Sequence, residues 1–372
     1  MTTKILLISL KHLGDVVTTT VVIPMLKNRF GNAEIHYLVN PPAVPLVDSH
    51  PDVAEVITAP RRAGPSDFLR LVRKLRGARY DFCLDFSEGD RAAFLSFLSG
   101  AGTRISYFTG RRYLFRNLAA HRQVPSWKVI KDRAATECHA DQARAIGCSE
   151  PTAPYASLGV SPEGRAEAEA FLSAHARAGT PYAVCHFTAT DRYRFWPEEH
   201  CADCVRYLAS RLGTVFLAAS GKESERAFVD RVIGLAGTGS VSTSGLSLAG
   251  MVALISGARG VVGLDSMVAH VAGACGVPVV GIFGPSRERT WAPKGPWVRA
   301  ARMNLPCRSC VTGGCLEHGR VSRCLKEMDF ETYVMPHLEE MLATPPPRKP
   351  WPPEEESMRL ALTPLPPPVV PA

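Results

Sequence analysis

The pair Gly14 and Asp15 lies in the segment LKHLGDVV, between a short apolar run and a segment with helical character. A carboxylate in such a loop has two chemical uses. It can cap the helix by accepting hydrogen bonds from the first backbone amides, or it can act as a general base that takes a proton from an attacking hydroxyl group. Taken alone, the residues favour the cap and leave the base open.

A second candidate is the block GVVGLDSMVAHVAGACGVPVVGIFGPS, residues 260–286. The helix expected after Asp265 has unpaired first amides and the positive end of its dipole at this point. Both features stabilise a bound phosphate, Ser266 adds a hydroxyl group, and His270 lies one turn later. The alternative is that Asp265 only caps the helix and His270 is an ordinary helical residue.

A third candidate is the loop HFTATDRYRFWP, residues 186–197, which carries Thr188, Thr190 and Arg194. Hydroxyl and guanidinium groups suit a diphosphate, because arginine binds phosphate oxygens in a fork. Glu223, in ASGKESE, could accept hydrogen bonds from ribose hydroxyls. A polar surface loop and a structural glutamate are the alternatives. Neither GxGxxG nor GxxxxGK[ST] occurs, which argues against a dehydrogenase fingerprint and a P-loop.

Alternating strand and helix patterns must position these residues. Apolar runs predict strands at 4–9, 33–39, 53–58, 80–86 and 103–108, with helices at 16–30, 66–76 and 91–99 between them. The pattern restarts with strands at 182–187, 214–220, 260–265 and 278–283, and a last helix is expected near 330–342. Such alternation predicts two doubly wound α/β domains that face a cleft, with ligands at the carboxyl ends of the strands.

Length and composition agree with two globular domains. The chain has 372 residues, of which 46% are hydrophobic and 21% charged. We expect a cytosolic protein, peripheral to a membrane at most, because no signal peptide is visible and no run reaches the ~20 apolar residues of a membrane span. The formal charge is +8, and residues 104–133 hold eight Lys or Arg against one acid. Such a run attracts anions, although a solvated basic surface is the alternative.

Cysteines and prolines mark the end of the chain. Eleven cysteines, an odd number, argue against a disulfide framework. Cys307, Cys310, Cys315 and Cys324 cluster near His318 and have ligand types that suit a structural zinc ion, but their spacing does not match a common zinc finger. Reduced packing thiols are therefore the preferred interpretation. Residues 344–372 are rich in proline and are expected to form an extended or disordered tail.

The order LGDVV, YDFCLDF, WPEEH, SGKESE, SLAGMVALI and GLDSMVAHVAGACGVPVVGIFGPS resembles glycosyltransferase family nine, the ADP-heptose:lipopolysaccharide heptosyltransferases, up to about Leu342. The resemblance implies a GT-B fold with two Rossmann-like domains. Residues 1–155 would bind the acceptor and residues 156–343 the nucleotide sugar. The resemblance also allows the last helix to pack back on the first domain. The resemblance also implies an inverting transfer of heptose from its ADP donor, with no bound metal or cofactor.

Matching the family's motifs residue by residue implies roles for single side chains. Asp15 falls on the proposed general base, Arg194 on a lysine that contacts the diphosphate, Glu223 on the acid that contacts ribose, and Leu246 on a methionine that contacts adenine. Around the phosphates, the resemblance places Thr188, Thr190, Asp265, Ser266, Met267 and His270. This chain has Ser-Met where the family commonly has Thr-Gly, and Met267 adds bulk close to the phosphate.

The implied acceptor is the anionic inner core of lipopolysaccharide at the inner leaflet of the membrane, and no nucleic-acid partner is expected. The residues expected to bind it are Arg61, Arg62, Arg104, Arg111, Arg112 and Arg116, which Arg70, Arg73 and Lys74 would join. Two alternatives stay open: a GT-B transferase with another nucleotide sugar or acceptor, and a nucleotide-sugar-binding module without turnover.

Overall fold

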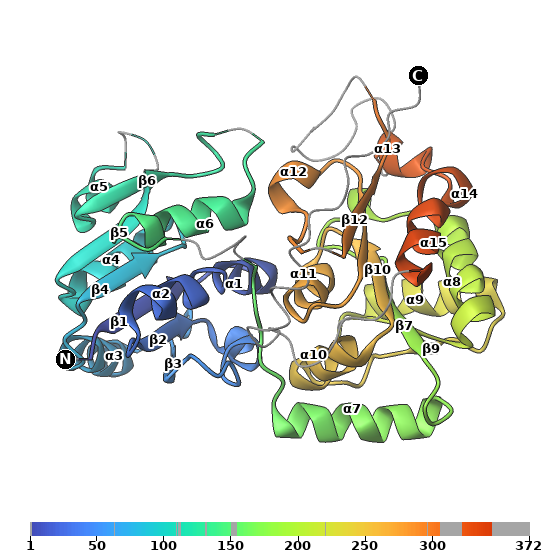
Figure 1. Ribbon diagram of the computed structural model, residues 1–372, viewed down its shortest axis with the longest axis horizontal. Helices are drawn as coiled ribbons and strands as arrows, with labels where there is room; N and C mark the ends of the chain where they lie inside the picture. Colours follow the sequence, from blue (N-terminus) through green and yellow to red (C-terminus); the bar gives the residue numbers. More distant parts are fainter. Residues whose placement is uncertain are drawn as a thin grey trace.

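The fold contains two parallel six-stranded sheets, one in each half of the chain. The computed structural model describes residues 2–62, 64–108, 110, 113–130, 132–149, 155–219, 221–295, 297–305 and 322–343. Figure 1 shows the two halves side by side, with α1 of the first half beside α11 of the second. The α/β class and the GT-B arrangement expected from the sequence are confirmed.

The first sheet has the strand order β3-β2-β1-β4-β5-β6, and every neighbouring pair is parallel. The strands are β1 (Lys4–Ser9), β2 (Glu34–Val39), β3 (Glu55–Thr58), β4 (Phe82–Asp85), β5 (Thr103–Phe108) and β6 (Arg122–Pro125).

The second sheet repeats this topology with the order β12-β11-β10-β7-β8-β9. Its strands are β7 (Tyr182–His186), β8 (Thr214–Leu217), β9 (Val241–Ser242), β10 (Gly260–Leu264), β11 (Val279–Phe283) and β12 (Val298–Arg302). In both sheets the strand order reverses direction between two central strands, β1 and β4 in the first and β7 and β10 in the second. Ligands of doubly wound sheets bind outside the carboxyl ends of the strands at this switch point.

Helices cover both sides of the first sheet. Ile5 and Leu7 of β1 belong to a core that includes side chains of α1, α2 and α6, whereas Leu6 and Ile8 belong to a core shared with α3 and α4. This alternation follows from the two-residue period of a strand. The elements are α1 (Leu13–Thr19), α2 (Val22–Phe30), the 3₁₀ helix η1 (Pro41–Leu46), α3 (Pro65–Gly77), α4 (Asp90–Ser99), α5 (Leu114–Ala119) and α6 (Ala135–Arg144).

The helices of the second half are arranged in the same way. One core joins β7 and β10 to α10 and α11, and another joins them to α8, α9 and the last helices. The elements are α7 (Pro162–His175), the 3₁₀ helix η2 (Arg192–Arg194), α8 (Glu198–Leu212), α9 (Glu223–Ala236), α10 (Leu248–Gly257), α11 (Met267–Ala274), α12 (Glu288–Trp291), α13 (Arg323–Lys326), α14 (Phe330–Tyr333) and α15 (Met335–Ala343).

Two expectations about helices need correction. The single helix expected at 16–30 is divided into α1 and α2, because Pro24 has no N–H to continue the hydrogen-bond ladder. The last helix does not pack back on the first half. α15 contacts β11 and β12, and its Leu338 and Met341 are buried in the core of the second half, where Figure 1 shows it on the outer side of that half.

Candidate active site

Asp15 occupies the loop-to-helix junction that follows β1, at the switch point of the first sheet. It is the third residue of α1, and its Oδ2 accepts a hydrogen bond from the backbone N–H of His12 at 3.3 Å. The side chain is half-buried. Asp15 is therefore part of the α1 cap. Its half-buried carboxylate also stays partly accessible, so a role as general base is not excluded by the cap.

The N-terminus of α1 lies against the N-terminus of α11 from the second half. A Cβ atom built on Gly14 would lie 3.2 Å from Cδ2 of His270 and 3.6 Å from Cα of Met267. The absence of a side chain at position 14 therefore permits this close approach. It brings the two switch points together, so the residue after Gly14 lies near the N-terminus of α11, a helix end whose unpaired amides favour an anion.

His270 is buried at this junction and lies between two carboxylates. Its Nε2 is 3.9 Å from Oδ1 of Asp265. Burial lowers the pKa of His270, and the charges of Asp265 and Asp15 oppose this effect without reversing it. The imidazole is consequently neutral at pH 7, so it can donate or accept one hydrogen bond but supplies no full positive charge to an anion.

Arg194 provides the charge at the α11 end. Its Nη2 donates to Oδ2 of Asp265 at 2.8 Å and to the backbone carbonyl of Asp265 at 2.9 Å. Arg194 is the last residue of η2, and Asp265 directly follows β10. The ion pair fixes the guanidinium beside the first turn of α11 and compensates the carboxylate that would otherwise repel a phosphate.

A chain of side chains extends from Ser266 to the start of α9. Ser266 Oγ is 2.9 Å from His186 Nδ1, and His186 Nε2 is 3.2 Å from Thr188 Oγ1. Thr188 donates to Oε2 of Glu225 at 3.5 Å, and Lys222 Nζ lies 3.5 Å from Oε1 of Glu225. Burial lowers the pKa of His186 to about 4, against a smaller opposing effect of Glu225. A neutral imidazole fits this chain, because one ring nitrogen donates and the other accepts.

His186 and Glu225 were not predicted as members of this cluster. The predicted acid, Glu223, is exposed on the first turn of α9, whereas Glu225 two residues later is buried and joined to Thr188. Thr190 is exposed, and Leu246 is half-buried in the loop before α10. The phase of α9 decides which glutamate points inward, and a strand-to-helix boundary known only within a few residues does not fix that phase.

A buried ionic group in the first half was also missed. Glu88, in the loop after β4, has a left-handed backbone with φ 53° and a buried side chain. Its Oε2 lies 3.0 Å from both Lys11 Nζ and Lys128 Nζ. Desolvation raises the pKa of Glu88, but the two lysine charges outweigh it and leave the pKa below its usual value.

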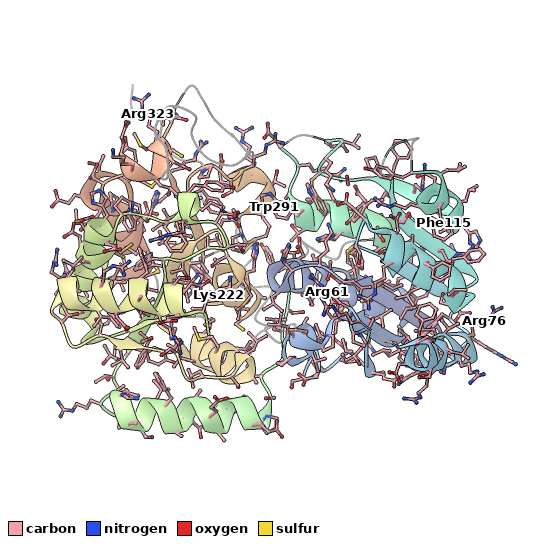
Figure 2. All side chains as sticks on the ribbon, turned by 180° about the vertical axis from the view of Figure 1, so that it is seen from behind. Arg61, Arg76, Phe115, Lys222, Trp291 and Arg323 are labelled. Atoms are coloured by element: carbon pink, nitrogen blue, oxygen red, sulfur yellow. The ribbon has the colours of Figure 1, made fainter. Side chains whose placement is uncertain are left out.

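The same lysine also contacts an aromatic pair that joins the two halves. Lys11 Nζ lies 4.4 Å above the ring of Trp127. Trp127 contacts Trp291 of the second half at 5.3 Å between ring centroids, and Figure 2 shows Trp291 on the side turned toward the first half.

Several cations of the basic run at 104–133 are engaged within the fold. Arg104 lies near the amino end of β5, and it donates to the carbonyls of Ala119 and Ala101 at 2.7 and 3.1 Å. Arg104 is therefore partly engaged by backbone carbonyls at the end of the strand opposite to the other candidate residues, and its binding of an acceptor stays a prediction. Other cations of the run pair with acids from elsewhere in the chain: Arg116 with Asp90, Lys128 with Glu88, and Arg133 with Asp141.

The other expected acceptor residues are placed as follows. Arg61 and Arg62 are exposed after the carboxyl end of β3, whereas Arg111 and Arg112 lie outside the described residues. Cys307, Cys310, Cys315 and His318 of the expected zinc cluster also lie outside them, and Cys324 is half-buried on α13. Within the described part of the chain, no group of three or more His, Cys, Asp or Glu residues is arranged to hold a metal ion.

Comparison with known proteins gives three kinds of similarity. A family model described as glycosyltransferase family 9 (heptosyltransferase) matches residues 68–320. Lipopolysaccharide heptosyltransferase 3 from Escherichia coli is 25% identical over 297 residues, which span 75% of this chain and 83% of that protein.

Two solved structures share the fold. The E. coli ADP-heptose lps heptosyltransferase II has a TM-score of 0.72 at 20% identity and covers 91% of this chain and 98% of its own. The E. coli heptosyltransferase WaaC with ADP-2-deoxy-2-fluoro heptose has a TM-score of 0.65 at 20% identity and covers 81% and 93%.

Proposed function

The chain belongs to glycosyltransferase family 9, and from this premise we propose that it transfers heptose from ADP-L-glycero-D-manno-heptose to the inner core of lipopolysaccharide. The E. coli relatives are named for transfer to lipopolysaccharide, which supports the acceptor class. The WaaC structure holds a fluorinated ADP-heptose, which supports the donor class.

The observation that carries the proposal is the contact between Gly14 of α1 and His270 and Met267 of α11. It brings a carboxylate from the first half, Asp15, next to a helix N-terminus from the second half. A base opposite a phosphate-binding helix end is the arrangement that displacement of a nucleotide by a hydroxyl group requires.

The proposed reaction is one in-line displacement. The acceptor oxygen forms a bond to the anomeric carbon of heptose while the bond from that carbon to the phosphate oxygen breaks, so the anomeric configuration inverts. Asp15 takes the hydroxyl proton as the new bond forms. ADP leaves with an additional negative charge on its terminal phosphate, which the α11 amides and the Arg194 guanidinium stabilise.

Each half has its own part in this proposal. Residues 1–155 hold the acceptor, and residues 156–343 hold the donor through the Ser266 end of α11 and the cluster at Thr188 and His186. We propose that N–H donors of the Arg194 guanidinium and the α11 dipole stabilise the leaving diphosphate, without a bound metal. An anionic, lipid-linked acceptor would place the enzyme at the cytoplasmic surface of the inner membrane.

Asp15→Asn is the sharpest test, because an asparagine oxygen can still accept the hydrogen bond from the His12 amide but cannot take a proton. We expect turnover to fall by about 10²-fold or more, with unchanged ADP affinity and melting temperature. Asp15→Ala removes the cap as well, and we expect a further loss of stability of about 1 kcal/mol. Near-normal turnover in Asp15→Asn would remove Asp15 from the role of base.

The choice of donor is tested separately by thermal shift with ADP, UDP and GDP, followed by a transfer assay with the matching nucleotide sugar. ADP should stabilise the protein most. A larger shift with UDP or GDP would indicate a GT-B transferase with another donor. Binding without transfer to any core acceptor would indicate a nucleotide-sugar-binding module.

A further inference from the structure

Exposed apolar side chains gather on one layer of helices in the first half. The described residues contain nine large hydrophobic side chains that are exposed, and six of them lie on α3, α4 and α5. Leu118 and Leu114 are the most exposed, at 68% and 66%. These six residues, called here the α3–α5 patch, are Leu69, Phe94, Phe97, Leu114, Phe115 and Leu118.

Ring contacts join the three helices into one continuous surface. Phe68 of α3 stacks on Phe94 of α4 with 6.0 Å between ring centroids. Phe115 of α5 lies 6.0 Å from Phe94 and 6.5 Å from Phe97. The patch is therefore a preformed aromatic surface, and an exposed surface of this kind usually marks an interaction site.

The helices that carry the patch are basic. α3, α4 and α5 hold two acids, Asp67 and Asp90, and six cations, which gives a net charge of +4: Arg70, Arg73, Lys74, Arg76, Arg91 and Arg116. Lys74 pairs with Glu55 of β3, and Arg70 and Arg116 pair with the two acids, whereas Arg73 and Arg76 are exposed on α3. Arg104 lies 5.5 Å from the ring of Phe97 at the edge of the patch. Figure 2 shows Phe115 and Arg76 at the end of the first half that is turned away from the second half.

The patch is connected to the acceptor side of the candidate site. Arg116 of α5 donates from Nη1 to the backbone carbonyl of Glu88 at 2.8 Å, and Glu88 pairs with Lys11, four residues before Asp15. α4 begins at Asp90, directly after this loop. A partner surface that binds the patch would therefore lie beside the Glu88 loop, which contacts the segment between Lys11 and Asp15, the proposed base.

We infer that the α3–α5 patch docks on an anionic lipid bilayer, with its phenylalanine and leucine side chains in the interfacial region and its cations at the lipid headgroups. The choice of a lipid surface rests on the proposed function, because the proposed acceptor is lipid-linked. Charge complementarity favours this occupant. A second copy docked face to face would bring two cationic surfaces together.

The patch binds at the surface and does not insert a span. In the described ranges, no helix combines the length and the apolar character that a bilayer crossing requires. Aromatic and leucine side chains with flanking arginines are the composition of surfaces that lie in the membrane interface. The reversible docking that such a patch gives would hold the acceptor edge of the first half next to the membrane.

Vesicle sedimentation of the full-length chain, without donor or acceptor, tests this inference. We expect binding to vesicles of phosphatidylcholine and phosphatidylglycerol in equal parts, weak binding to pure phosphatidylcholine, and loss of binding as salt is raised. The double variant Phe97→Ser/Leu118→Ser should bind about tenfold more weakly. Leu235→Ser is the matched control, because Leu235 is 50% exposed on α9, and it should bind as the wild type does.

A charge variant keeps the test independent of packing. Arg73→Glu should weaken binding to the anionic vesicles, whereas Arg177→Glu, at an exposed position of the second half, should not. Equal binding by patch and control variants, or no binding by the wild-type chain, would overturn the inference. So would conversion of a dimer to a monomer by the patch variants, because the patch would then join two copies. ADP binding by the same samples reports separately on the proposed function.

Discussion

Arg194 and Asp265 form a two-point contact in which one guanidinium nitrogen donates to both the side chain and the backbone carbonyl of the aspartate. The pair joins η2, in the loop after β7, to the junction between β10 and α11. It therefore places a guanidinium and the carboxylate that it compensates at the same helix end, where the proposed diphosphate would bind.

The first prediction compares ADP affinity when Arg194 alone is replaced and when both members of the pair are replaced. Arg194→Ala leaves the Asp265 carboxylate uncompensated at an anion site, so ADP should bind about tenfold more weakly or worse. Adding Asp265→Asn removes the repulsion, so the double variant should bind ADP more tightly than Arg194→Ala alone. Isothermal titration calorimetry measures both affinities. A double variant weaker than Arg194→Ala would show that Asp265 itself supports the nucleotide.

The second prediction separates Glu225 from Glu223. Glu225 is buried and joined to Thr188, whereas Glu223 is exposed. We expect Glu225→Gln to weaken ADP binding about tenfold, as loss of a charged hydrogen-bond acceptor does, and Glu223→Gln to have little effect.

The ribose contact itself can be isolated with 2′-deoxy-ADP. If Glu225 accepts from the ribose, Glu225→Gln should lose less affinity for 2′-deoxy-ADP than for ADP. Equal losses for the two nucleotides would assign Glu225 a purely structural role in the Thr188 cluster. A larger effect of Glu223→Gln would return the ribose contact to Glu223.

The central strands could be predicted from the sequence because parallel strands buried on both faces form continuous apolar runs. β1, β7, β10 and β11 are of this kind, and all are largely buried. The edge strands β6, β9 and β12 were not predicted. β9 has two residues, and β6 and β12 contain arginines that interrupt the pattern.

The positions of those candidate residues that directly follow a predicted strand could be predicted from the sequence. Asp15 and Ser266 follow strands that the alternation predicts, so a doubly wound arrangement places both at carboxyl ends of strands, where ligands bind. The net charge of the basic run could not be predicted, for the opposite reason. Its partners Glu88, Asp90 and Asp141 are supplied by other elements and by the tertiary fold, so a count of local charge does not show how much of it is already neutralised.

The third prediction uses the opposite pKa shifts of His186 and Asp85. Burial lowers the pKa of His186 to about 4, so between about pH 6.5 and pH 4 the unfolded chain binds the extra proton and stability falls as the pH falls. Burial raises the pKa of Asp85 to about 6, so between about pH 4 and pH 6 the folded chain binds the extra proton and stability rises as the pH falls. One such group changes the free energy of unfolding by at most about 1.4 kcal/mol per pH unit.

His186→Asn should therefore flatten the loss of stability below pH 6.5, and Asp85→Asn should steepen it. Urea unfolding at a series of pH values measures both slopes. Asparagine at position 85 can still accept from the Ser87 amide, which lies 2.8 Å from Oδ1. Slopes that change in the same direction for the two variants would contradict the assigned protonation states.

The last prediction concerns Gly14, whose missing side chain permits contact between the two halves. A Cβ at this position would already lie 3.2 Å from His270 Cδ2, so Gly14→Ala should disturb the contact slightly and Gly14→Val should separate α1 from α11. Because displacement depends on the distance between base and donor, we expect kcat to fall about tenfold or more in Gly14→Val, with a smaller loss in Gly14→Ala.

Stability should not follow turnover in this series, because replacing a helical glycine by alanine by itself stabilises a helix by up to about 1 kcal/mol. A lower kcat at an equal or higher melting temperature would therefore identify the contact between the halves as the cause. Gly234→Val is the matched control, since a Cβ on Gly234 of α9 meets no atom within 4 Å. If Gly14→Val and Gly234→Val gave equal turnover, the α1–α11 contact would not set the geometry of transfer.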